Sequence, residues 1–240
     1  MNEKTPTPLE NQQLAQSKSE LGTFWHRARS ALVSDFIDKN SLESVADIGA
    51  GAGHLGNWLR VRVKGVSYFF EEELNSVEQI LIQKFGESNR LRSTDPLEVD
   101  LVVLLDVLEH IENDSEFLKT VRGRMRVSSK ILVTVPAGKF LFSWWDKELG
   151  HFRRYNKETI NSLFINAGFS KVSVAYLFPE LVFPSWLRKL RGPKLGDERI
   201  AEFPSLPKQI DLLIYRLLRL SSFFRKLTPI GTSLILIGEY

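Results

Sequence analysis

A carboxylate followed by three closely spaced glycines is the group of residues in this sequence most suited to binding a ligand. Asp47 precedes Gly49, Gly51 and Gly53 in residues 45–53, which read VADIGAGAG. Glycine permits tight turns and lets a ligand approach the backbone closely. Open α/β sheets bind ligands where their strands end. The pattern therefore predicts a ligand-binding turn between a strand and a helix.

Two kinds of cofactor fit these glycines. Residues 51–56 match G-x-G-x-x-G, and Glu71 follows Gly51 by twenty residues, which would suit a nicotinamide oxidoreductase. Residues 47–53 also match D-x-G-x-G-x-G. A carboxylate at Asp47 would repel a pyrophosphate but could hold the ammonium group of S-adenosylmethionine (SAM). The acid therefore favours SAM over a dinucleotide.

A second group of candidate residues lies in the polar loop 146–155 and at Trp145 directly before it. His151 is the leading candidate for a general base, because histidine titrates near neutral pH, and Asp146 could orient it. The other candidates are Tyr155 for catalysis and Trp145, Arg153 and Arg154 for substrate contact. A purely structural interpretation stays open, in which ion pairs hold this loop down and the tryptophan anchors the core.

Alternating strand and helix patterns predict the scaffold that positions these groups. Strands are expected at 44–48, 66–70, 91–94, 100–105, 130–135, 171–177 and 232–238, with helices at 21–39, 54–60, 75–85, 114–125 and 156–166. This order predicts an α/β fold, with a seven-stranded, mostly parallel sheet and helices on both faces.

The two ends of the chain differ from this central pattern. Residues 1–20 are polar and are expected to form a flexible tail, so that the domain spans 21–240. Residues 180–230 are rich in proline and basic residues and predict a helical insertion before the last strand. The apolar and basic segment 208–227 is interpreted as a lid, with contact to anionic lipid as the alternative.

Composition narrows the range of functions. The chain has no cysteine, which excludes disulfides, thiolate zinc sites and cysteine nucleophiles. Its four histidines lack H-x-x-x-H spacing, so no metal is expected. A net charge of +3 gives no argument for a nucleic-acid partner. The polar N-terminus and the absence of an apolar run of ~18 residues predict a cytoplasmic protein, with attachment to the inner face of a membrane left open.

The motifs together resemble the class I SAM-dependent methyltransferase superfamily, which has a Rossmann-like fold. The resemblance rests on residues 47–53, on Glu71 and on the sequence DVLEH at 106–110. It implies that Glu71 binds the ribose hydroxyls, that Asp95 lies near the adenine and that Asp106 lies beneath the methyl donor. The residues implied for the rest of the cofactor are Asp47, Gly49, Ala50, Gly51 and Gly53.

A narrower resemblance concerns bacterial methyltransferases associated with polysaccharide or glycoconjugate genes. It rests on Pro136, on Gly168-Phe169, on residues 145–155 and on the early aromatic and basic segment 24–29. The resemblance implies methyl transfer from SAM to a small-molecule, saccharide or lipid-linked acceptor, leaving S-adenosylhomocysteine. Enzymes that methylate the exocyclic amines of nucleic-acid bases usually carry [DNS]-P-P-[YF] after the fourth strand, and this motif is not found at 106–109.

Two alternatives stay open at this point. The first is a nicotinamide oxidoreductase, and the second is an accessory protein that binds SAM without catalysis. The sequence predicts no oligomeric state.

Overall fold

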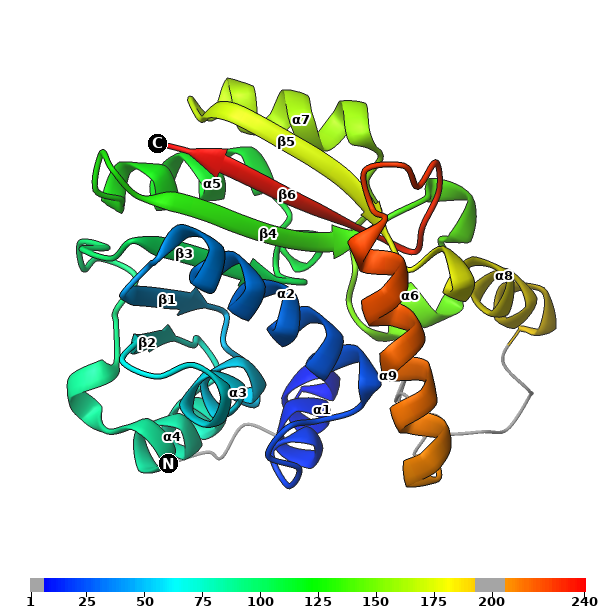
Figure 1. Ribbon diagram of the computed structural model, residues 1–240, viewed down its shortest axis with the longest axis horizontal. Coiled ribbons are helices and arrows are strands. Elements are labelled where there is room, and N and C mark those ends of the chain that lie inside the picture. Colours follow the sequence, from blue (N-terminus) through cyan, green and yellow to red (C-terminus); the bar gives the residue numbers. More distant parts are fainter. Residues whose placement is uncertain (1–6, 193–205) are drawn as a thin grey trace.

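A six-stranded sheet forms the centre of the computed structural model, which describes residues 7–192 and 206–240 (Figure 1). The strands are β1 (Ser44–Ile48), β2 (Ser67–Glu71), β3 (Leu101–Leu105), β4 (Lys130–Pro136), β5 (Ser170–Leu177) and β6 (Ser233–Glu239). Their order is β2-β1-β3-β4-β6-β5. Strands β1 to β4 pair in parallel, whereas β6 is antiparallel to both β4 and β5. The carboxyl ends of β1 to β4 therefore meet at one edge.

Helices cover both faces of this sheet. On one face α2 (Phe24–Asn40), α3 (His54–Arg62) and α9 (Lys208–Phe223) pack around Leu32, Leu59 and Leu218. On the other face α5 (Asp114–Arg124) and α7 (Lys157–Asn166) contribute Leu118 and Phe164. The remaining helices are α1 (Pro8–Gln16), α4 (Asn75–Phe85), α6 (Trp144–Glu148) and α8 (Val182–Arg191), with 3-10 turns η1 (Glu87–Asn89), η2 (Leu108–His110), η3 (Lys139–Leu141) and η4 (Pro179–Leu181).

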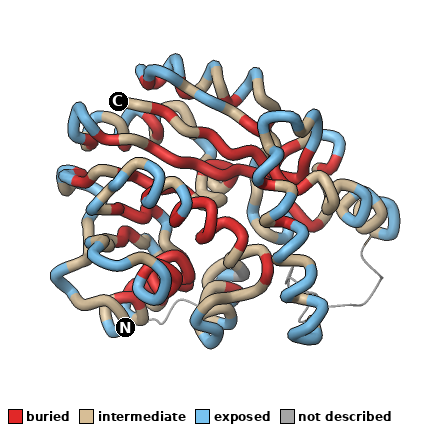
Figure 2. Tube along the Cα trace, in the orientation of Figure 1, coloured by how far each residue is buried: buried red, intermediate tan, exposed pale blue. Residues whose placement is uncertain are grey.

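The central strands are buried along most of their length (Figure 2). Residues Leu101 to Leu104 of β3 are fully buried, which explains the continuous apolar run LVVLL. A parallel strand covered by helices on both faces has no solvent side that would favour a polar residue. The predicted α/β fold with a mostly parallel sheet and helices on both faces is confirmed.

The sheet has one strand fewer than predicted within the described residues. At the expected third strand, the Leu91 amide donates to the Phe70 carbonyl at 2.7 Å, but pairing goes no further than an isolated bridge. The Asp95 side chain accepts a hydrogen bond from the Arg92 amide at 2.8 Å and closes a turn. Because the connection to β3 is short and turns here, the predicted strand at 91–94 does not form.

Part of the predicted flexible tail is helical. Helix α1 begins after Thr7, whose side chain accepts a hydrogen bond from the Glu10 amide at 3.2 Å, and it packs against α4. A threonine followed by proline is a helix-start signal, because the side chain caps a free amide and proline fixes φ. The first six residues lie outside the described part.

The predicted insertion contains η4, α8 and α9, between β5 and β6. Its residues 193–205 lie outside the described part. Helix α9 begins at Lys208 as expected but ends at Phe223 rather than near residue 227. Within 7–192 and 206–240, no helix is both long enough and apolar enough to cross a membrane.

Candidate active site

The glycine turn follows β1 and needs glycine at three positions. Gly49, Gly51 and Gly53 have φ angles of 71°, 52° and 77°, a region that L side chains rarely adopt. A Cβ atom on Gly49 would lie 2.8 Å from Val107 Cγ2, so a side chain at this position would also clash with the segment that follows β3. The turn thus keeps its backbone amides close to the edge where the parallel strands end.

Asp47 lies at the end of β1 with 2% of its surface exposed. The Tyr68 hydroxyl donates a hydrogen bond to its Oδ2 atom at 2.8 Å. Burial raises the pKa of Asp47 from 3.8 to about 7, and the hydrogen bond from Tyr68 opposes this rise. A buried carboxylate with one neutral donor is suited to a cationic ligand, which would restore the ionised form.

Two adjacent acids, at the last position of β2 and directly after it, have different partners. Glu71 forms an ion pair with Arg124 at 2.6 Å, and both side chains are nearly buried. Glu72 instead accepts a hydrogen bond from the Gly51 amide at 2.7 Å and another from the Leu74 amide at 3.0 Å. Glu71 contacts the glycine turn through its backbone carbonyl, which accepts from the Gly49 and Ala50 amides, but the carboxylate that reaches the turn is that of Glu72 and not that of the predicted Glu71.

Asp106 follows β3 and has a φ angle of +58°, which is uncommon for a residue other than glycine. Its carboxylate accepts hydrogen bonds from Thr134 Oγ1 at 2.9 Å and from Trp25 Nε1 at 3.2 Å, and it forms an ion pair with Arg29. Three neighbours from two elements, α2 and β4, therefore fix this acid at the sheet edge.

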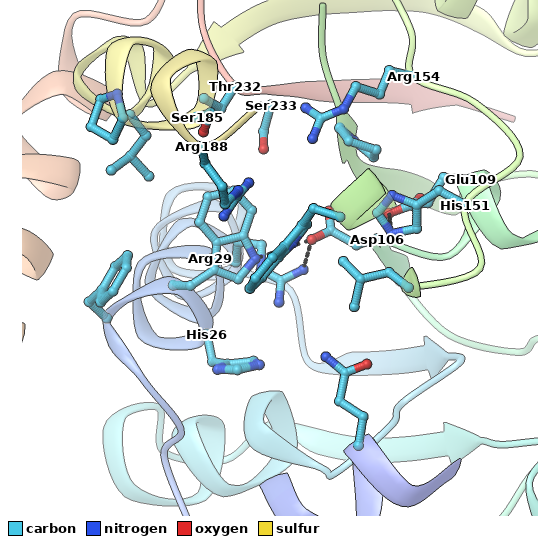
Figure 3. Close-up of a pocket in the computed structure, with 18 of the residues that line it drawn as sticks. His26, Arg29, Asp106, Glu109, His151, Arg154, Ser185, Arg188, Thr232 and Ser233 are labelled. Atoms are coloured by element: carbon cyan, nitrogen blue, oxygen red, sulfur yellow. Dashed lines mark hydrogen bonds and ion pairs between the residues drawn. The ribbon is translucent and has the colours of Figure 1, made fainter. Parts of the chain in front are cut away.

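Two cavities meet at Asp106. The smaller, of about 90 Å³, lies over the glycine turn and is also lined by Gln13 and Asp47. The larger, of about 800 Å³, extends from Asp106 past Trp145 to helix α8. Both cavities are lined by His26, Arg29, Leu105 and Asp106. Figure 3 shows Arg29 and Asp106 in the middle of the larger cavity, with Arg188 on one side and His151 on another.

The loop after β4 brings the predicted polar residues together. His151 Nδ1 lies 3.1 Å from Asp146 Oδ1, and Arg154 Nε donates to the same oxygen at 2.6 Å. Although burial acts to raise it, hydrogen bonds from His151 and Arg154 lower the pKa of Asp146. His151 and Arg154 both line the larger cavity, and Glu109 lies beside them (Figure 3). The structure therefore brings Asp146 and His151 into contact, while their predicted roles in catalysis stay a prediction.

Six predicted site residues line neither of these two cavities, namely Gly53, Glu71, Asp95, Asp146, Arg153 and Tyr155. The Tyr155 hydroxyl donates to Asp114 at 2.7 Å, and Arg153 pairs with that carboxylate at 2.7 Å. Both residues therefore hold the loop against the start of α5. Asp95 closes the turn at Arg92. Trp145 does line the larger cavity, where the guanidinium carbon of Arg188 lies 4.1 Å from its ring centre.

Several cavity residues were not predicted as site residues. Gln13 comes from the supposed tail, and its Oε1 atom would lie 2.6 Å from a Cβ atom on Gly51. Trp25, His26 and Arg29 come from the early segment that carried the narrower resemblance. Arg188 is on α8, and burial lowers its pKa to about 10. Of these residues, only those in the segment 24–29 gave a signal in the sequence. The others were missed because helix periodicity does not show which face of a helix lines a cavity.

The family model described as "Methyltransferase domain" matches residues 23–174. The chain belongs to this family, and the prediction of a class I methyltransferase is confirmed. Membership of this family also excludes the alternative interpretation of the glycine pattern, in which the chain would be a nicotinamide oxidoreductase. The narrower bacterial subgroup stays a prediction.

Solved structures show the same fold at low sequence identity. A SAM-dependent methyltransferase from Archaeoglobus fulgidus has a TM-score of 0.52 and 17% identity, over 88% of this chain and 94% of that one. The methyltransferase domain of bacterial CtHen1-CN scores 0.54 at 12% identity, over 90% and 100%. Phosphoethanolamine N-methyltransferase 2 of Haemonchus contortus, in complex with SAM, scores 0.53 at 14% identity, over 82% and 48%. No curated protein matches the sequence.

Proposed function

We propose that this chain is a SAM-dependent methyltransferase whose acceptor is an anionic, lipid-linked molecule bound in the larger cavity. The observation that carries the proposal is the meeting of the two cavities at Asp106, Arg29 and His26. A cofactor over the glycine turn and an acceptor in the larger cavity would share this boundary. Methyl transfer requires such contact, because the protein mainly aligns the nucleophile with the methyl carbon.

The residues around the glycine turn fit the polar groups of SAM. Asp47 supplies a carboxylate for the ammonium group, and Glu72 supplies one for the ribose hydroxyls. The sulfonium of SAM provides an already activated methyl group. Gln13 and Gln16 of α1 cover the turn from the other side and leave little space over it. Helix α1 must therefore shift for the cofactor to enter.

The larger cavity combines apolar walls with guanidinium groups. Trp144, Trp145 and Leu187 supply apolar surface, and Arg188 points into the space (Figure 3). Arg188 pairs with no carboxylate within the described residues. Burial lowers the pKa of Arg188, and the positive charge of nearby Arg154 adds to this effect. An arginine held in this way is suited to a phosphate or carboxylate group. These features support an acceptor that carries both an anionic and an apolar part.

The helices of the insertion expose apolar stripes at helical spacing. On α8, Phe183, Trp186 and Leu190 are 66%, 42% and 61% exposed. On α9 the exposed apolar side chains include Leu213, Leu217, Leu220 and Phe223, while Leu218 packs into the core. Exposed basic residues flank both stripes, namely Arg191, Arg216 and Lys226. Apolar stripes with basic flanks are typical of helices that lie on anionic membranes.

Helix α8 connects this surface with the cavity. Its other side lines the larger cavity through Pro184, Leu187 and Arg188. An acceptor anchored in a lipid surface could therefore extend its polar head past α8 towards Asp106. This placement supports a lipid-linked acceptor over a freely diffusing one. It favours the alternative of lipid contact over the lid for segment 208–227, and it adds α8 to the contact surface.

A transfer assay with labelled SAM tests the proposal. Purified protein is incubated with methyl-labelled SAM and either a lipid extract of bacterial membranes or the water-soluble extract. We expect label in the lipid fraction, and loss of it in the Asp47→Asn variant. Label in the water-soluble fraction alone would contradict the lipid-linked acceptor, and label in neither would favour a protein that binds SAM without catalysis.

A further inference from the structure

We propose that Glu109, His110 and His151 form a binding site for a divalent transition-metal ion, such as zinc, in the wall of the acceptor cavity. Their ligand atoms lie within 4.8 Å of one another. All three residues line the larger cavity. The sequence spacing of the histidines gave no indication of this site. His110 precedes β4 in the sequence and His151 follows it, and only the fold brings the two together.

The Glu109 side chain carries the first part of the argument. It is fully buried, and neither carboxylate oxygen has a hydrogen-bond partner within the described residues. The neighbouring charges are already matched, since Asp106 pairs with Arg29 and Asp146 pairs with Arg154. Among the described acids of this wall, Glu109 is therefore the one without a direct cation. Burying an unpartnered carboxylate is costly, and a metal ion would compensate for it.

The orientation of His151 carries the second part. Its Nδ1 atom lies 3.1 Å from Asp146, whose carboxylate is buried and also held by Arg154. An N–H at this atom leaves a lone pair on Nε2, which faces Glu109 (Figure 3). Metal-binding histidines commonly donate their second nitrogen to a carboxylate in this way. Asp146 would thus act as a positioning residue for the metal ligand.

The distances are close to those of an occupied site. Glu109 Oε1 and His151 Nε2 are 3.9 Å apart, too far for a direct hydrogen bond. Two ligands bound to one tetrahedral zinc ion lie about 3.4 Å apart, given bond lengths of about 2.1 Å. The His110 and His151 rings meet edge to face, with centres 4.7 Å apart. Small side-chain rotations would complete the site.

The ligand set indicates both the ion and its use. Two imidazoles and one carboxylate suit zinc or another divalent transition ion better than magnesium. Three protein ligands leave a position open towards the cavity, as in catalytic zinc sites. This use rests on the proposed methyltransferase function. An acceptor hydroxyl bound there would lose its proton to water, form a bond to the methyl carbon as the carbon–sulfur bond breaks, and leave the electron pair on sulfur.

The metal refines the role predicted for His151. Its Nε2 atom binds the ion and does not take up the acceptor proton, because the ion itself lowers the pKa of the bound hydroxyl. Removing the metal should therefore stop transfer to a hydroxyl acceptor while leaving His151 in place.

The test is calorimetric titration of the full untagged chain, stripped with a chelator, with zinc, cobalt(II) or magnesium chloride. We expect one zinc or cobalt ion per chain, a visible absorption band for bound cobalt, and no comparable magnesium binding. His151→Gln and Glu109→Gln should weaken metal affinity by about 100-fold or more, and Asp146→Asn by about 10- to 100-fold. Glu112→Gln, which changes an exposed carboxylate nearby, is the matched control and should bind as the wild type does.

SAM binding is measured on the same proteins and separates the metal site from the proposed function. Retained SAM affinity shows that a ligand variant is folded, and Asp47→Asn should lose SAM but keep zinc. Absence of zinc and cobalt binding in the wild type, or equal metal affinity in wild type and both ligand variants, would overturn the metal site. Zinc binding without SAM binding would leave the site standing and overturn the proposed function.

Discussion

Replacing Asp47 with asparagine should stabilise the ligand-free protein and at the same time abolish its binding of SAM. Asparagine keeps an acceptor for the Tyr68 hydroxyl, which donates to Asp47 at 2.8 Å, but it removes the charge. Burial raises the pKa of Asp47 from 3.8 to about 7. The folded protein therefore holds this proton more tightly than the unfolded chain does, so wild-type stability falls as pH rises from about 4 to about 7.

The size of the effect follows from the change in pKa. A rise from 3.8 to about 7 corresponds to about 4 kcal/mol of destabilisation at pH 8, when Asp47 must be ionised in both states. About 3 kcal/mol of this accumulates between pH 5 and pH 8. For a chain of this length, that difference corresponds to roughly 5–10 °C in the melting temperature.

Thermal unfolding of wild type and Asp47→Asn, without ligand and at several pH values from 5 to 8, measures this difference. We expect a small advantage of the variant at pH 5, of about 1 kcal/mol, which grows towards pH 8. Parallel pH curves for the two proteins would refute the reasoning, because they would show that Asp47 titrates alike in the folded and unfolded states. Glu73→Gln, at an exposed acid near the same edge, controls for the loss of a charge.

Three further predictions concern other residues. Glu72→Gln should weaken SAM binding by about 10- to 100-fold, since it removes a charge-assisted hydrogen bond, whereas Glu71→Gln should lower the melting temperature more than the affinity for SAM. Calorimetry and thermal unfolding of both variants measure these effects, and the reverse pattern would restore Glu71 as the ribose acid. Arg188→Gln should raise the KM for the acceptor about 10-fold or more with little effect on SAM affinity, and steady-state kinetics showing an unchanged KM would remove Arg188 from the acceptor site. The double variant Phe183→Ser, Trp186→Ser should lose most of its binding to vesicles of anionic lipid in a sedimentation assay. The control Ile165→Ser, which changes an exposed apolar residue on α7, should keep this binding. Equal binding of both variants would place the membrane contact elsewhere.

The fold could be predicted from the sequence because its signals are local. Continuous apolar runs such as 101–105 mark strands buried on both faces, and the turn at 49–53 follows directly from glycine spacing. The segment 91–94 misled the prediction, since one leucine and one threonine do not show whether an edge strand finds a partner. Helix α1 was missed because its polar composition outweighed the capping signal at Thr7.

The site was predictable only in part. The motif around Asp47 and the pair formed by Asp146 and His151 are short-range features of the sequence. Which of two adjacent acids faces the glycine turn depends on the path of the chain after β2, and this separates Glu72 from Glu71. The contact between His110 and His151 depends on how the loop after β4 folds back, which no spacing rule could reveal.

The most direct test of the central claim is calorimetric titration of the wild-type chain and Asp47→Asn with SAM, S-adenosylhomocysteine and NADH. The structure predicts that SAM and S-adenosylhomocysteine bind the wild type with micromolar affinity, that the variant loses both, and that NADH binds neither protein. Binding of NADH alone, or SAM binding that survives the loss of Asp47, would contradict the assignment of the cofactor site.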